Sequence, residues 1–69
     1  MKIDELGKFI KNRRKVLGLT IRDLAELTSL SKTTISQIER GLSNPTFDVL
    51  QNILEFLNLE ISVDVKNHK

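Results

Sequence analysis

The chain has 69 residues, no cysteine and a formal net charge of +2 at pH 7, which limits the kinds of protein it can be. A chain of this length has room for one domain with one small core, and without cysteine it forms neither disulfides nor thiolate metal sites. The single histidine, His68, lies in a polar tail, so we expect no metal site and no cofactor. No apolar stretch approaches the roughly 20 residues of a membrane-spanning helix, and the N-terminus does not resemble a secretory signal, so we expect a cytoplasmic protein.

The charged residues are distributed unevenly along the chain. Residues 1–40 carry nine Lys or Arg and five Asp or Glu, whereas residues 41–65 carry four acids and no Lys or Arg. Such an asymmetry lets one part of a protein face phosphates while another part faces water or a partner subunit. Ordinary solvated helix faces explain the same distribution, so charge alone does not decide between the two interpretations.

The first half of the chain predicts two helices. Apolar residues recur at helical spacing over residues 3–17, and Gly18 stands where a C-terminal cap is expected. A second, short helix begins after Thr20, whose hydroxyl can accept from the backbone near Asp23 while the Asp23 carboxylate reaches back, and it ends near Thr28. The apolar residues expected to point inward are Ile3, Leu6, Ile10 and Leu17 in the first helix and Leu24, Ala25 and Leu27 in the second.

Two further helices are predicted downstream. Ser31 is a favourable N-cap for a third helix, and Gly41 ends it. Residues 43–45 have the composition of a turn, and Thr46 then caps a fourth helix. The inward residues expected in these helices are Ile35 and Ile38, followed by Phe47, Leu50, Ile53, Leu54 and Leu57.

Residues 59–66 follow a different pattern. Apolar and polar residues alternate, and this period of two predicts a strand whose apolar positions are Leu59, Ile61, Val63 and Val65. No other segment predicts a strand that could pair with it, and an unpaired strand leaves its backbone donors and acceptors open. We therefore expect these four residues to mediate dimerisation, by antiparallel pairing with the same segment of a second copy. A frayed tail, or a strand packed loosely on its own domain, is the alternative.

The second and third predicted helices have the parts of a helix-turn-helix. Both are short, and a break at residues 29–30 joins them. Ala25 is small enough to let the helices approach, while Leu30 and Ile35 fill the space between them. The outward face of the third helix carries hydrogen-bonding side chains that suit base edges and phosphates. These residues are Lys32, Thr33, Ser36 and Gln37.

A longer pattern surrounds this unit. It comprises Leu17-Gly18-Leu19-Thr20, then Leu24-Ala25, then Leu-Ser-Lys-Thr-Thr-Ile-Ser-Gln-Ile-Glu-Arg-Gly over residues 30–41, then Asn44-Pro45-Thr46. Over roughly residues 5–59 the chain resembles the XRE/Cro-repressor family. The resemblance implies an all-α, four- to five-helix, lambda-repressor-like domain over residues 1–58. The dimerisation strand at 59–66 and a tail at 67–69 follow it.

The resemblance also implies roles for individual residues, because in this family the helix that begins at Ser31 enters the major groove of DNA. Lys32, Thr33 and Gln37 are expected to contact base edges, with Ser36 as a fourth contact. Lysine can donate to guanine, glutamine can pair with adenine, and threonine can touch the methyl group of thymine. The expected phosphate contacts are Arg22, Ser31, Thr34, Arg40, Ser43, Asn44 and Thr46.

Other charged residues have a structural interpretation. By resemblance to the family, Arg14 and Glu39 are expected to form an internal ion pair that links the first helix to the end of the third. Breaking a partly buried pair is costly, so a change at Glu39 should affect folding before recognition. Arg13 and Lys15 fit phosphate contacts or solvated charge, and we favour solvated charge.

Two positions depart from the family pattern. The family commonly has a phosphate-contacting glutamine where this chain has Ile21, which cannot make that contact, and we expect the neighbouring Arg22 to compensate. The turn position often filled by glycine is Ser29, which must accept an unfavourable backbone angle or shift the turn.

These features favour a sequence-specific regulator of transcription, a repressor that binds a palindromic operator as a homodimer. The strand that follows the domain also resembles HipB-type antitoxins, which implies repression of their own operon and binding to a HipA-like kinase toxin. A protein-interaction module with incidental DNA binding is the alternative from another class. An enzyme is not expected, because no motif pairs a nucleophile with a base. We expect the protein at the bacterial nucleoid and not at a membrane.

Overall fold

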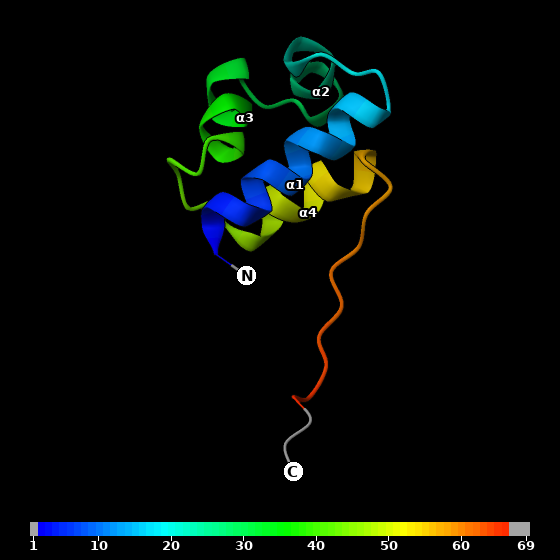
Figure 1. Cartoon of the computed structure of the whole chain (residues 1–69). Helices are drawn as coiled ribbons and strands as arrows, with labels where there is room; N and C mark the ends of the chain where they lie inside the picture. Colours follow the sequence, from blue (N-terminus) through cyan, green and yellow to red (C-terminus); the bar gives the residue numbers. More distant parts are fainter. Residues whose placement is uncertain (1, 67–69) are drawn as a thin grey trace.

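The computed structural model describes residues 2–66, and this part of the chain contains four α-helices (Figure 1). They are α1 (Ile3–Val16), α2 (Ile21–Thr28), α3 (Lys32–Glu39) and α4 (Phe47–Phe56). The all-α class predicted from the sequence is therefore confirmed, with four helices rather than five in the described chain. No helix in these residues is long and apolar enough to cross a membrane.

Side-chain caps begin α2, α3 and α4. The hydroxyl of Thr20 accepts from the Asp23 N–H at 3.0 Å, and the Asp23 carboxylate accepts from the Thr20 N–H at 2.8 Å, which completes the predicted capping box. Ser31 and Thr46 each accept from the N–H three residues further along, at 3.0 Å and 3.2 Å. Because these bonds satisfy N–H groups that lack a partner inside the helix, the three helix starts follow from local sequence.

One hydrophobic core lies where the helices meet. Helix α3 packs against α1 and α2, and α4 packs against α2. The buried apolar residues come from all four helices and from the residue after α4: Ile10, Leu24, Ala25, Ile35, Ile38, Ile53, Leu54 and Leu57. Leu30 and Leu50 pack against this cluster but are only half-buried. The predicted inward face of each helix is thus correct near the middle of the helix.

Near the helix ends the burial predicted from this periodicity was wrong. Phe47, expected on the inner face of α4, is 63% exposed, and Leu27, expected inside α2, is 45% exposed. Ile3 and Leu17, at the two ends of α1, are 38% and 40% exposed. Periodicity gives the direction in which a side chain points, but at these positions no neighbouring element fully covers that direction.

The strand expected over residues 59–66 is absent from the described chain. These residues lead away from the helical body in Figure 1, and no segment of residues 2–66 pairs with them as a strand. Leu59 is half-buried, whereas Val63 is 92% and Val65 is 89% exposed. Alternation specifies only the two faces, while a strand also requires a hydrogen-bonded neighbour, so the single chain does not support the predicted strand. The predicted tail, residues 67–69 with His68, lies outside the described residues.

Helices α1 and α3 approach each other closely at Gly7. A Cβ atom at this position would overlap the carbonyl oxygen of Ile38 and would lie 2.7 Å from that of Glu39. Both oxygens belong to the last turn of α3. The missing side chain therefore lets the backbone of α1 rest directly on the end of α3, which fixes where α3 lies in the fold.

Candidate nucleic-acid interface

Helix α3 has one buried and one exposed face. Ile35, Ile38 and Glu39 are 1%, 2% and 5% exposed. The side chains predicted to contact bases lie on the opposite side, where Lys32, Thr33 and Gln37 are exposed and Ser36 is half-buried. Packing of the inner face therefore holds the helix while its polar face stays accessible.

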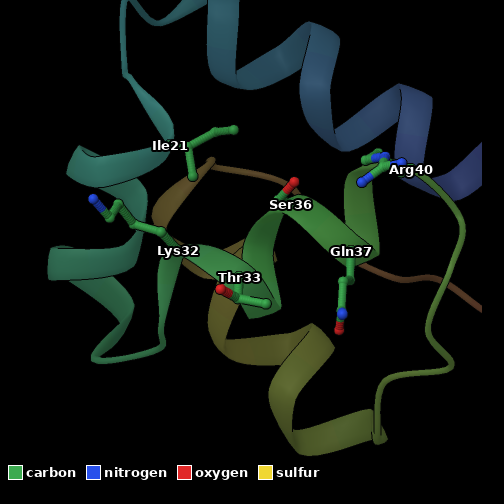
Figure 2. A pocket seen from close by; sticks show the side chains of 6 residues that line it. All are labelled: Ile21, Lys32, Thr33, Ser36, Gln37 and Arg40. Carbon is green, nitrogen blue, oxygen red and sulfur yellow. The ribbon is translucent and has the colours of Figure 1, made fainter.

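The polar face borders an open hollow of about 440 Å³ (Figure 2). All four predicted base-contacting residues line it, together with Arg40, which was predicted to contact phosphate. The sixth lining residue is Ile21, the first residue of α2. Sequence reasoning noted Ile21 only as a lost phosphate contact and did not place it beside the base-contacting residues.

The lining residues of α3 form two rows. Residues four apart share a helix face, so Lys32, Ser36 and Arg40 follow one line along the hollow, while Thr33 and Gln37 follow another. In Figure 2 Ile21 lies on the side of the first row, and Thr33 and Gln37 extend to the other side. Two lining residues are cationic and none is acidic, so the hollow favours a negatively charged ligand.

The turn between α2 and α3 determines how α3, and with it this polar face, is oriented relative to α2. Ser29 has φ 61° and ψ 25°, which is the left-handed conformation that its departure from glycine predicted. The N–H of Leu30 donates to the carbonyl of Ala25 at 3.1 Å and closes the end of α2. The chain thus keeps the tight turn and accepts the strain at Ser29 instead of shifting the break.

A buried ion pair holds the end of α3 to α1, as predicted. Arg14 donates from Nε to Oε2 of Glu39 at 2.7 Å and from Nη2 to Oε1 at 3.0 Å, and both side chains are almost fully buried. The third guanidinium nitrogen, Nη1, donates to the carbonyl of Leu19 at 2.8 Å. The hydrogen bonds to Glu39 raise the pKa of Arg14 despite its burial. The hydrogen bonds of Arg14 thus join α1, the loop before α2 and the last turn of α3.

Two further hydrogen bonds that sequence reasoning missed brace the helix ends. Arg13 donates from Nε to the carbonyl of Leu57 at 2.9 Å, so it is not a freely solvated charge. Asn52 donates from Nδ2 to the carbonyl of Thr28 at 2.8 Å, which caps the end of α2 from α4. Neither bond has a local sequence signal, because the partners lie 44 and 24 residues apart.

The other predicted phosphate contacts lie outside the hollow. Arg22 follows Ile21 on α2, is exposed, and lies 3.7 Å from the equally exposed carboxylate of Glu26. Ser31 and Thr34 are hydrogen-bonded to each other at 2.9 Å at the start of α3. Ser43, Asn44 and Thr46 lie in or next to the segment before α4, with Asn44 and Thr46 exposed. Among residues 2–66 no group of three His, Asp or Glu side chains is placed to hold a metal ion.

Comparison with known proteins agrees with this geometry. The model of the helix-turn-helix family HTH_3 matches residues 10–63, which is most of the chain. The chain belongs to this family. An uncharacterized HTH-type transcriptional regulator of Mycobacterium tuberculosis is 39% identical over 57 residues, which are 83% of this chain and 41% of that protein. This helix-turn-helix chain therefore spans less than half the length of that regulator.

Two solved structures place the same fold on DNA. The biofilm master regulator SinR, in complex with DNA, is 34% identical with a TM-score of 0.74, covering 78% of this chain and 87% of its own. The restriction-modification controller protein C.Esp1396I, a tetramer in complex with its natural 35 base-pair operator, is also 34% identical, with a TM-score of 0.78. That match covers 84% of this chain and 76% of the controller chain. The helix-turn-helix fold of this chain is thus one found in DNA-bound regulators.

Proposed function

We propose that this chain is a sequence-specific, double-stranded DNA-binding regulator of transcription that represses by occupying an operator. The observation that carries the proposal is the hollow along α3, which groups hydrogen-bonding side chains with two cations. An α-helix fits the major groove of B-DNA, where each base pair offers a distinct set of donors and acceptors. We assign base contacts to Lys32, Thr33 and Gln37, with the half-buried Ser36 as a fourth contact.

Phosphate contacts flank this helix in the proposal. Arg40, which follows α3, and Arg22 on α2 are both exposed, and we assign a phosphate contact to each. Polar residues and N–H groups at or just before the starts of α3 and α4 are the other candidates, since helix N-termini attract phosphate. These residues are Ser31, Thr34, Ser43, Asn44 and Thr46.

We further propose that the repressor is a homodimer joined through residues 59–66. Val63 and Val65 expose nearly their whole side chains, and the backbone around them has no strand partner in the described chain. A second copy of the same segment would cover the exposed valines and supply a strand partner for the backbone. Leu59 and Ile61 extend this surface to a groove that Leu6, Phe9 and Leu54 also line. A HipA-like toxin partner is not supported by the relatives named above, which are DNA-binding regulators.

Selection of bound sequences from a random duplex pool at near-physiological salt tests the DNA-binding proposal. We expect a palindrome whose half-sites lie about 34–36 Å apart, one turn of DNA. Lys32→Ala should weaken the preference at one or two base pairs, whereas Lys11→Ala, an exposed lysine on α1, should not. Binding without any enriched sequence would contradict the proposal and would favour a protein partner.

The dimer is tested by substituting the exposed valines. Val63→Asp with Val65→Asp should leave the helical fold intact, because both side chains are exposed in the single chain. The double variant should sediment as a monomer, whereas the wild type should sediment as a dimer. Operator affinity should fall by at least about tenfold, since two linked half-site contacts become one. Ser62→Asp on the polar positions of the segment is the matched control. An unchanged sedimentation mass in the double variant would contradict dimerisation through this segment.

A further inference from the structure

We propose that Ile21 is a specificity-determining residue, and that its side chain contacts the C5-methyl group of a thymine in the operator. This inference rests on the proposed function, because it takes the hollow along α3 to face base edges. The juxtaposition that motivates it is an aliphatic side chain in a hollow whose other lining residues are Lys32, Thr33, Ser36, Gln37 and Arg40.

Ile21 is held firmly in this position. It is the first residue of α2, directly after Thr20, whose capping box with Asp23 fixes the start of the helix. Part of its side chain packs against the hydrophobic core, and the rest remains accessible in the hollow. Because a β-branched side chain has few rotamers, little conformational entropy is lost when its exposed part meets a ligand.

The chemistry of the major groove narrows what Ile21 can contact. Base edges offer nitrogen and oxygen donors and acceptors, together with one apolar group, the C5-methyl of thymine. Placing an isoleucine against a polar edge removes water from that edge and returns no hydrogen bond. Contact with a methyl group removes apolar surface from water on both sides. Ile21 therefore favours thymine and disfavours the other bases at its position.

The place of this thymine in the half-site follows from the two rows of α3. Ile21 lies beside the row of Lys32 and Ser36, while Gln37 extends to the other side (Figure 2). The thymine should consequently neighbour the base pair that Lys32 contacts. Substitutions at Ile21 and at Lys32 should then alter adjacent positions of the selected sequence, and Gln37→Ala should alter a different one.

Replacement of thymine by uracil tests the inference directly, because uracil differs only by the missing methyl group. Each thymine of the selected half-site is replaced singly, and the affinity of the wild-type protein for each duplex is measured by fluorescence anisotropy. We expect one replacement, next to the base pair of Lys32, to weaken binding about three- to fivefold, the effect of removing one buried methyl group.

The same duplexes are then bound by Ile21→Ala. This variant should bind the thymine and uracil duplexes equally at that position while keeping the preferences that depend on Gln37. The ratio of the two affinities does not depend on how much of a variant preparation is folded. Leu27→Ala is the matched control, because Leu27 is an exposed apolar residue of the same helix that lines a different surface, and it should keep the wild-type ratio.

The outcomes separate this inference from the proposed function. A half-site without thymine beside the Lys32 position, or a thymine-to-uracil ratio that Ile21→Ala leaves unchanged, overturns the role of Ile21 while sequence-specific binding stands. Selection that enriches no sequence overturns the proposed function and the role of Ile21 together.

Discussion

The inner and outer faces of α3 are held in different ways. On the inner face, Ile35 and Ile38 are almost completely buried, and Glu39 shares two hydrogen bonds with Arg14. On the outer face, Lys32 and Gln37 are exposed and line the hollow. The two faces share one backbone but differ in their surroundings, since the inner face is held by protein packing and the outer face is open to a ligand.

This difference separates stability from recognition. Substitutions on the inner face, or in the elements that hold it, should change the free energy of unfolding. Substitutions on the outer face should change DNA affinity while the free energy of unfolding stays nearly constant.

Glu39→Ala should destabilise the fold most. It leaves the guanidinium of Arg14 buried without its carboxylate partner, which typically costs about 3–5 kcal/mol. Urea unfolding followed by circular dichroism measures the loss. Glu26→Ala is the control, because Glu26 pairs with Arg22 at 3.7 Å on the surface and its loss should cost under about 1 kcal/mol. Similar losses in the two variants would show that the Arg14–Glu39 pair does not anchor α3.

Gly7→Ala should have the next largest effect. The added methyl group overlaps the carbonyl oxygens at the end of α3, so α1 must move away, at a cost of about 1–3 kcal/mol. On an open helix surface the same change would stabilise, because alanine is the better helix former. Thermal unfolding distinguishes a packed glycine from one on an open surface, with Lys11→Ala as the exposed control on the same helix. A stabilised Gly7→Ala variant would contradict the close approach of α1 and α3.

Stability should also depend on pH through the α2 capping box. Hydrogen bonds from the backbone and then the side chain of Thr20 lower the pKa of Asp23 below its ordinary value of 3.8. A carboxylate with a lowered pKa in the folded state contributes stability above its unfolded pKa and loses that contribution as pH falls through the folded value. Asp23→Asn should therefore be less stable than wild type at neutral pH, and the difference should vanish well below pH 3.8. Melting temperatures of both proteins, measured from neutral pH to below pH 3.8, show whether the stability difference disappears on acidification as expected.

The elements that the sequence predicts best are those with a local cause. Thr20, Ser31 and Thr46 start helices through hydrogen bonds three residues away, so their neighbours in sequence are enough to identify them. The strain at Ser29 follows equally from its place in a tight turn. The ion pair of Arg14 and Glu39 was different, because its residues are 25 positions apart and only resemblance to a known family predicted it.

The elements that sequence reasoning missed depend on distant partners. The absence of a side chain at Gly7 matters only because the end of α3 lies against it. Arg13 and Asn52 meet carbonyl groups of other helices, and Ile21 meets the hollow of α3 only after α2 and α3 have packed. At residues 59–66 the alternation was real, but pairing needs a second strand that the described chain does not supply.

The most direct test of the separation between the two faces is the Gln37→Ala variant, measured for both unfolding and DNA binding. The free energy of unfolding should stay within about 0.5 kcal/mol of wild type, because Gln37 is exposed. Affinity for the selected operator should fall by about 1–3 kcal/mol, with the preference lost at one base pair. Gln51→Ala, an exposed glutamine on α4 away from the hollow, should change neither quantity. If Gln37→Ala binds every duplex as wild type does, the outer face of α3 does not read DNA.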